Sequence, residues 1–143
     1  MTNPLIGTWH LKSWYLETEN GVKHFALGPD ASGYISYSED GYIFVHIIAA
    51  GRQLNASDDL FSGTVAEDSA ALKSQLSYAG RYEYREGQVT HHVKFSSHPN
   101  WVGTEQVRYV RFFDENQLEL RANGSRMQDH VGTGYIIWER GTR

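Results

Sequence analysis

The two ends of the chain carry matching strand-like segments, and this pairing constrains the fold more than any other feature of the sequence. Gly7-Thr8-Trp9 opens the first extended segment, and Trp138-Glu139-Arg140 closes the last one. About nine short strand-like runs and one helix-like run occupy the chain. When the first and last strands meet, an antiparallel sheet closes into a barrel, which either fills its interior or encloses one small ligand.

Turn signals divide the chain at intervals typical of hairpins. Asn20-Gly21 and Asp40-Gly41 are strong signals for tight turns, and Glu86-Gly87 marks another. We therefore predict an all-β fold, a closed antiparallel up-and-down barrel of eight to ten strands with one mid-chain helix, in a single domain spanning 1–143. The predicted strands are Leu5–Leu16, Val22–Leu27, Gly33–Ser38, Gly41–Ala49, Gly80–Arg85, Gln88–Phe95, Glu105–Phe113, Leu118–Ala122 and Gly132–Arg140.

One segment has the pattern of a helix. Thr64 and Glu67 match a capping box, in which each side chain satisfies a free backbone N–H of the first turn. Good helix formers follow, so we predict a helix from Val65 to about Tyr78 that lies across a barrel mouth. The stretches 50–63, 96–104 and 123–131 are predicted as loops.

The composition excludes several classes of protein. The 143 residues include no cysteine, which excludes disulfides, thiolate metal sites and cysteine nucleophiles. A net charge of −4 and scattered Lys and Arg argue against a nucleic-acid partner. No apolar run is long enough to span a membrane, and the first residues lack the pattern of a signal peptide. We therefore expect a cytoplasmic protein with no nucleic-acid or membrane partner.

Several segments together resemble the lipocalin-like domain proteins of bacteria and fungi. They are Gly7-Thr8-Trp9, Gly33-Tyr34-Ile35-Ser36-Tyr37, Asp40-Gly41-Tyr42, Tyr78-Ala79-Gly80-Arg81-Tyr82, Val89-Thr90-His91-His92-Val93 and Pro99-Asn100-Trp101-Val102-Gly103-Thr104. The resemblance implies a calycin-type barrel with an internal ligand cavity. It also implies that a basic residue of the last strand packs on the signature tryptophan, here Arg140 on Trp9.

His91 is the first candidate for a polar group inside the barrel. Neighbouring residues of a strand point to opposite faces, and His91 alternates with Val89, Val93 and Phe95, whereas His92 alternates with polar residues. His91 is therefore predicted to face inward, where it would bind a ligand or act as a general acid or base. The alternative is a core histidine that pairs with a neighbouring tyrosine or carbonyl.

His46 is a second candidate, on the strand from Gly41 to Ala49. It shares a face with Tyr42 and Phe44, and if this face points inward all three line the cavity. The opposite face is also apolar, which suggests that the outer side of this strand is covered, and the preferred alternative for His46 is a buried side chain that its neighbours satisfy.

Further ligand-binding candidates are Tyr82, Trp101 and Arg108. Tyr82 would supply aromatic area, and Trp101 is either a lid over the mouth or an anchor for its loop. An arginine inside the barrel would bind a carboxylate or phenolate. For Arg108 and for Arg81 the outer face is the preferred interpretation, because each could pair with a carboxylate across strands.

Three functions remain open. The favoured one is binding of a small, largely apolar, aromatic or polyketide-like molecule. The second is an isomerase, cyclase or hydratase that uses His91 as its acid or base, and the third is a packed structural module that oligomerises. No metal-ligand spacing, nucleophile motif or cofactor fingerprint is present, so we predict no metal and no cofactor. A homodimer is left open.

Overall fold

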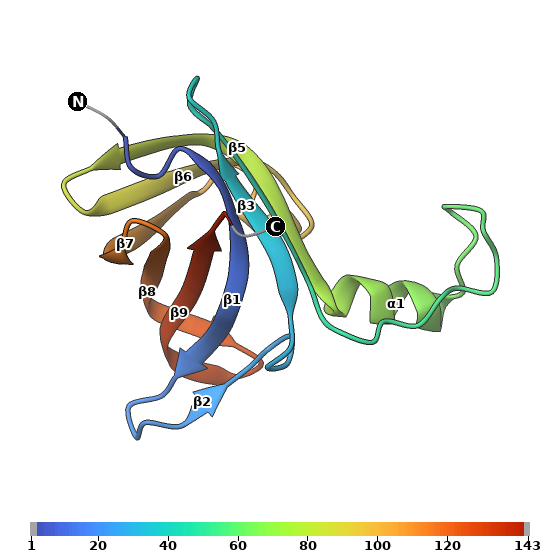
Figure 1. The fold of residues 1–143 in the computed structure, drawn as a ribbon. Helices are drawn as coiled ribbons and strands as arrows, with labels where there is room; N and C mark the ends of the chain where they lie inside the picture. The colour runs from blue at the N-terminus through green and yellow to red at the C-terminus, as the bar shows by residue number, and fades with distance from the viewer. Residues whose placement is uncertain (1–2, 142–143) are drawn as a thin grey trace.

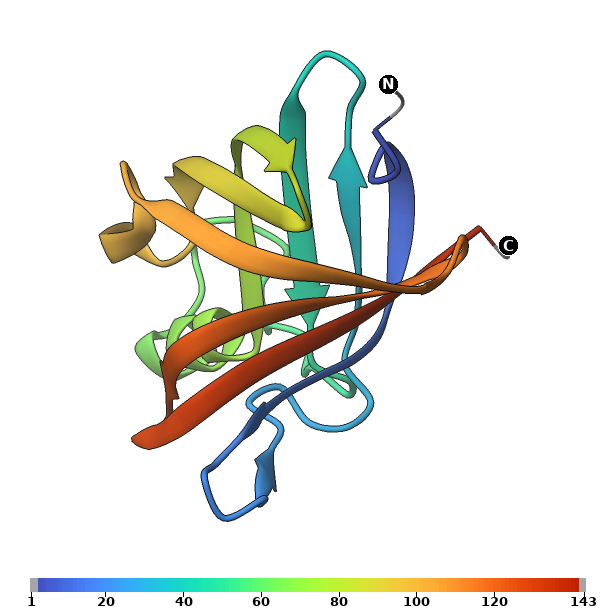
Figure 2. The same ribbon diagram turned by 90° about the vertical axis from the view of Figure 1, so that its left-hand side faces the viewer.

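The computed structural model describes residues 3–141, and its strands form one antiparallel sheet that closes on itself (Figures 1 and 2). The sheet order is β2-β1-β3-β4-β5-β6-β7-β8-β9, and β1 also pairs with β9. Eight strands build the wall, because the two-residue β2 only extends the end of β1. The predicted closed barrel is confirmed. The elements are β1 (Gly7–Glu17), β2 (Lys23–His24), β3 (Ser32–Tyr37), β4 (Tyr42–Ile48), α1 (Val65–Lys73), β5 (Gln75–Arg85), β6 (Gln88–Ser96), the 3-10 helix η1 (Pro99–Trp101), β7 (Glu105–Asp114), β8 (Gln117–Met127) and β9 (His130–Arg140).

The chain ends meet where the barrel closes. Trp9 of β1 lies opposite Arg140 of β9 in the ladder, and Trp9 and Trp138 are both fully buried. The Arg140 guanidinium carbon lies 4.0 Å from the centre of a Trp9 ring, so the contact expected from the chain ends is present. Arg140 also donates to the carbonyls of Pro4 and Ile6. These bonds tie the N-terminal segment across the closed end of the barrel.

The turn between β5 and β6 follows the sequence directly. Glu86 (φ 52°) and Gly87 (φ 80°) both adopt left-handed backbone. A two-residue hairpin needs this conformation at both central positions to match the twist of its strands. Glycine adopts it without steric cost, which explains why Gly87 marks the turn.

The mid-chain helix begins as predicted but ends earlier. Thr64 caps α1 and Glu67 completes the capping box, but the helix stops at Lys73 rather than near Tyr78. Residues 75–79 belong to β5, because their alternation places Leu76 and Tyr78 on the inner face. The expectation that the helix crosses the mouth is also wrong, since α1 and the preceding loop project away from the barrel (Figure 1) and α1 has no buried residue.

The predicted loop at 123–131 is mostly strand. β8 continues to Met127 through an irregular pairing between Ala122 and Ser125, and β9 begins at His130. Gln128 and Asp129 make the tight turn with positive φ of 49° and 66°. The segment is polar because these strand ends extend beyond the core, and a polar composition is typical of loops. The sequence therefore predicted a loop here. A separate difference concerns β2, which spans only Lys23–His24 and is shorter than the predicted strand Val22–Leu27.

The core lies toward the closed end of the barrel. Inward aliphatic residues of β3, β4, β6 and β8 pack there around the two buried tryptophans, and this cluster includes Ile35, Ile43, Val89 and Leu118. No helix within residues 3–141 is long and apolar enough to cross a membrane.

Candidate functional site

A cavity of about 850 Å³ occupies the other half of the barrel. Its wall is apolar over most of its depth, with Trp14 from β1, Ile35 from β3, Ile47 from β4 and Ile136 from β9. Trp138 also lines the cavity, at the next inward position after Ile136 toward the closed end. The buried Trp138 indole N–H has no hydrogen-bond partner within residues 3–141. A bound molecule with an acceptor atom could satisfy it.

A buried tyrosine–histidine–tyrosine cluster lies behind one wall of the cavity. His91 Nε2 lies 2.7 Å from Tyr37 Oη, and His91 Nδ1 lies 2.9 Å from Tyr78 Oη. His91 points inward from β6, as the strand alternation predicted, and it is 1% exposed. Of the three side chains only Tyr78 lines the cavity. His91 therefore reaches a ligand through the Tyr78 hydroxyl and not directly.

Burial keeps all three rings of this cluster neutral at pH 7. It lowers the pKa of His91 well below its usual value, and the Arg108 guanidinium lowers it further. Burial also raises the pKa of Tyr78 to about 12 and raises the pKa of Tyr37 well above its usual value. A neutral imidazole has one N–H donor and one acceptor nitrogen.

The tautomer of His91 decides what Tyr78 offers to the cavity. When Nδ1 carries the proton it donates to Tyr78 Oη, and the Tyr78 hydroxyl proton is then free for a ligand acceptor. When Nε2 carries the proton, Tyr78 donates to Nδ1 and presents its oxygen as an acceptor. Tyr37 adjusts by donating or accepting at the other ring nitrogen. Tyr78 can thus serve either kind of ligand group without a charge forming in the core.

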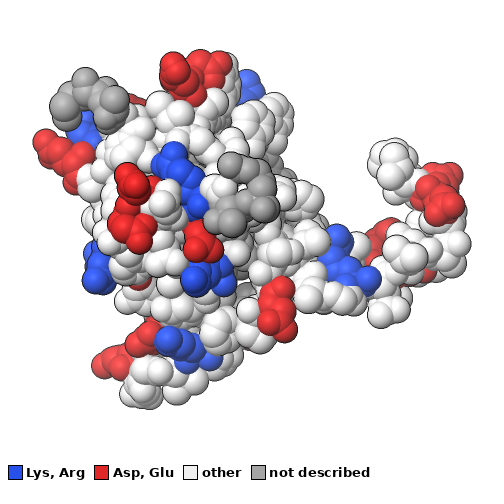
Figure 3. All heavy atoms as spheres, viewed as in Figure 1, with Lys and Arg blue, Asp and Glu red and all other residues white. Residues whose placement is uncertain are grey.

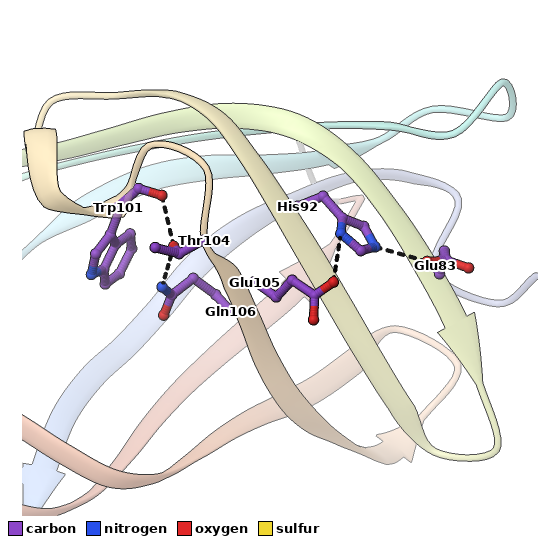
Figure 4. A network of polar contacts seen from close by, with 6 residues as sticks. All are labelled: Glu83, His92, Trp101, Thr104, Glu105 and Gln106. Atoms are coloured by element: carbon purple, nitrogen blue, oxygen red, sulfur yellow. Dashed lines mark hydrogen bonds and ion pairs between the residues drawn. The ribbon is translucent and has the colours of Figure 1, made fainter.

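Arg108 brings a positive charge to the cavity wall. It lies on β7 and lines the cavity with Gln106. Arg108 Nη1 donates to the Val107 carbonyl, and Arg108 Nη2 lies 3.5 Å from Gln106 Oε1. Gln106 donates to Thr104 Oγ1, and Thr104 donates to the Trp101 carbonyl (Figure 4). Within residues 3–141 no ion pair forms with Arg108. The cation is held in place by neutral groups and remains free to bind an anion or a strong acceptor.

Trp101 forms the aromatic side of the same region. It lies in η1, lines the cavity, and packs edge-on against Tyr78 with ring centres 5.3 Å apart. The Arg108 guanidinium carbon lies 6.0 Å from the Trp101 ring. Trp101 therefore anchors its loop and also contributes to the cavity wall, so the two alternatives for it are not exclusive.

The prediction that Tyr42, Phe44 and His46 line the cavity is wrong. All three point outward from β4, while Ile43, Val45 and Ile47 point inward. Both faces of this strand are apolar, so the alternation alone could not decide between them. The branched aliphatic residues fill the interior, and the bulkier aromatic rings lie on the outer surface.

Strand β6 departs from its predicted alternation at one end. The pairing with β5 shifts between Ala79 and Gly80, which leaves Lys94 as an extra residue. Phe95 therefore points outward and is 65% exposed, although it was expected to share the face of His91. His92 points outward as predicted, and its ring lies between the carboxylates of Glu83 and Glu105 (Figure 4).

The remaining candidates divide between the interior and the surface. Tyr82 is buried but does not line the cavity, because its hydroxyl donates to the Ser38 carbonyl and accepts from Asn3 near the closed end. Arg81 is on the outer face, as preferred, and stacks on Tyr42. Arg108 is inside, so the preference for its outer face is wrong.

Sequence reasoning missed three residues of the site: Tyr78, Gln106 and Trp138. Tyr78 was assigned to the end of the helix, although it shares period-two spacing with Tyr82 and Tyr84 of β5. Gln106 alternates with Arg108, so placing one inside places both. The sequence position of Trp138 marks the end of the last strand but does not show that its ring reaches the cavity. Within residues 3–141 no group of three His, Asp or Glu side chains is arranged to hold a metal ion.

A curated protein with related sequence is a 4'-hydroxy-3'-methoxypropiophenone carrier protein of Aspergillus oryzae. It is 33% identical over 72 residues, which cover 45% of this chain and 65% of the fungal protein. The match thus spans less than two thirds of that relative.

A solved structure shows the same fold at low sequence identity. A lipocalin-like protein from Bacteroides uniformis matches with a TM-score of 0.51 and 12% identity, over 96% of this chain and 100% of its own. A protein from Bacteroides eggerthii matches with a TM-score of 0.47 and 12% identity, over 95% and 99% of the two chains. The second likeness is too weak to support an argument. The sequence profile of the lipocalin-like domain matches residues 6–141, and the chain belongs to this family.

Proposed function

We propose that this protein binds a small, largely apolar aromatic molecule in the barrel cavity and that Arg108 holds a carbonyl, phenolate or carboxylate oxygen of it. The observation that carries the proposal is an arginine without an ion-pair partner, among residues 3–141, that lines the cavity beside the rings of Tyr78 and Trp101. The half-buried guanidinium donates to the Val107 carbonyl and to the Gln106 amide oxygen, and its remaining N–H donors can bind a ligand oxygen.

The shape and chemistry of the cavity support an aromatic ligand. A volume of about 850 Å³ is within the range of small-molecule sites, which are mostly apolar with a few placed polar groups. Trp14, Trp101 and Trp138 offer ring faces and edges to an aromatic body. The name of the Aspergillus oryzae relative, a carrier of a phenolic ketone, supports the same ligand class.

Tryptophan fluorescence provides the test, because three of the four tryptophans line the cavity. A panel of hydroxyphenyl ketones, benzoates and matched alkylbenzenes is titrated into the protein. Saturable quenching by the oxygenated compounds is expected, and Ala122→Phe, which fills the cavity, should abolish it. Gln88→Phe, at an exposed position of β6, should leave it unchanged. Equal quenching of both variants would place binding outside the cavity and contradict the proposal.

A second function, acid–base catalysis, is favoured by one observation. The Tyr37–His91–Tyr78 cluster can pass a proton from the cavity wall into the core and back, because each contact is a hydrogen bond between neutral groups. In this reaction the Tyr78 oxygen would take the α-proton of a bound ketone while its own hydroxyl proton passes to His91 Nδ1, which leaves an enolate and an imidazolium until the proton returns to carbon. Exchange of the ketone's α-hydrogens in heavy water, faster with the protein than with Tyr78→Phe, would identify this activity. No difference between the two proteins would leave binding alone.

A further inference from the structure

Among residues 3–141, the most exposed large apolar side chains lie on a projecting arm. We define the arm as residues 50–73, the long loop after β4 together with α1 (Figure 1). Phe61 and Leu54 are each 94% exposed, Leu60 is 89% exposed and Val65 is 88% exposed. Large apolar side chains exposed to this degree and gathered on one segment of a folded protein favour an interaction site.

The arm is a built structure, although it makes no core of its own. Glu67 accepts hydrogen bonds from the backbone of Thr64 and of Ala56, which ties the loop to the first turn of α1. Arg52 donates to Ser74 and to the Ala71 carbonyl at the other end of the helix. A nine-residue helix with no buried residue is marginal by itself. These hydrogen bonds hold the loop against α1, so the arm keeps its shape while its apolar side chains stay exposed to a partner.

The outer face of the barrel carries a matching groove. It lies over β3, β4, β5 and β6, and its apolar lining includes Tyr34, Phe44 and Phe95. These three rings are 58%, 56% and 65% exposed. They include the residues of β4 and β6 that point outward where the sequence suggested the interior. The groove, with a volume of about 490 Å³, is thus an apolar surface that residues 3–141 of the same chain leave uncovered.

We propose that two copies of this chain form a symmetric dimer in which the arm of each copy lies in the outer groove of the other. An apolar projection and an apolar groove on one chain meet reciprocally around a twofold axis, as an isologous interface requires. Each aromatic side chain offers about 150–250 Å². Phe61, Tyr34, Phe44 and Phe95 with the arm's aliphatic residues therefore approach the ~800 Å² per partner of a stable interface.

The charges of the two surfaces are complementary. The arm contains Asp58, Asp59, Glu67 and Asp68 against Arg52 and Lys73, and acidic atoms gather at its outer end (Figure 3). Beside the groove, Lys94 precedes Phe95 and is exposed on the outer face of β6. An acidic arm tip is repelled by an anionic lipid surface, whereas it is attracted to this lysine. The partner is therefore a second copy rather than a membrane.

The dimer would also reach the cavity. Leu72 and Lys73, at the base of the arm, line the cavity in the same chain. An arm held by the partner would fix this part of the cavity rim.

Light scattering coupled to size exclusion tests the dimer in the full chain. The wild type should have twice the mass of one chain, and Phe61→Asp on the arm and Phe44→Asp in the groove should each reduce it to one. Val131→Asp replaces a 53% exposed residue of β9 outside both surfaces and should leave the dimer intact. Because the chain has no cysteine, Phe61→Cys combined with Phe44→Cys should give one disulfide-linked dimer on oxidation.

A monomeric wild type would overturn the proposal. So would a dimer that survives both Asp variants, because it would then use another surface. The proposal would also be overturned if anionic vesicles captured the wild type in a flotation experiment and did not capture Phe61→Asp. The arm would then bind lipid.

Discussion

Tyr78 separates His91 from the cavity: its hydroxyl lies 2.9 Å from His91 Nδ1, and of these two residues only Tyr78 lines the cavity wall. The buried histidine is therefore satisfied within the protein and influences a ligand only by orienting a phenol. Its second nitrogen is held by Tyr37 in the same way. This arrangement combines the two alternatives for His91, since it is a paired core histidine and also part of the site.

Replacing His91 with Phe should destabilise the fold, because the hydroxyls of Tyr37 and Tyr78 lose their partner. A buried polar group left without a hydrogen bond costs about 1–3 kcal/mol. Urea denaturation measures this as a lower free energy of unfolding. The double variant Tyr37→Phe with His91→Phe also removes the Tyr37 hydroxyl, which would otherwise lack a partner. Its decrease in the free energy of unfolding should therefore be smaller than the sum of the decreases for the two single variants. Additive losses would show that the Tyr37–His91 bond contributes nothing.

The stability should fall as the pH decreases below about 6.5. The pKa of His91 is lowered in the folded state, so the unfolded chain binds this proton more readily and acid favours unfolding. Each pH unit between the two pKa values costs up to about 1.4 kcal/mol. His91→Gln keeps hydrogen-bonding capacity without this proton, so its stability should change less between pH 7 and pH 5. Parallel pH profiles of the two proteins would contradict a buried neutral histidine.

Arg140→Met should weaken the closed end of the barrel. The substitution keeps part of the packing on Trp9 but removes the cation–π contact, which contributes about 0.5–2 kcal/mol, and the two bonds to the carbonyls of Pro4 and Ile6. Thermal unfolding should occur at lower temperature. Arg140→Lys keeps the charge, but a lysine cannot bridge two carbonyls as the planar guanidinium does. Its unfolding temperature should therefore lie between those of the wild type and Arg140→Met. An unchanged midpoint for Arg140→Met would show that the stack is not stabilising.

Thr64→Ala should loosen α1 without loosening the barrel. The Thr64 side chain accepts from the Glu67 backbone, and losing such a cap costs about 0.5–2 kcal/mol. Because α1 has no buried residue, this cost should appear as local opening. Hydrogen exchange should become faster in α1 and stay the same in β8. The matched substitution Ser69→Ala, inside the helix, should have no such effect, and equal exchange in all three proteins would refute the cap.

The fold could be predicted because its signals are local. Turn residues such as Asn20-Gly21 and Glu86-Gly87, the capping box at Thr64 and the aromatic ends of the chain each specify one element. Closure then follows from pairing the ends.

The site was harder to predict because it depends on which face of each strand is inside. On β4 both faces are apolar, so Phe44 and His46 were placed in the cavity when they lie outside it. On β6 the extra residue Lys94 reverses the alternation, so Phe95 changes sides. For His91 the neighbours differ clearly in polarity, and its face was predicted correctly. Arg108 could not be assigned, because charged residues are normally outside and only the geometry of β7 places it in the cavity.

The claim that Arg108 holds the ligand is tested most directly by isothermal titration calorimetry, which measures the affinity of Arg108 variants for a hydroxyphenyl ketone. Arg108→Met should lose about 1.5–3 kcal/mol of binding, the contribution of a hydrogen bond to a charged group, which is on the order of a ten- to hundredfold weaker affinity. Arg111→Met removes the same charge from an exposed position of the same strand and should bind as the wild type does. Equal affinities of Arg108→Met and Arg111→Met would contradict the claim that Arg108 holds the ligand.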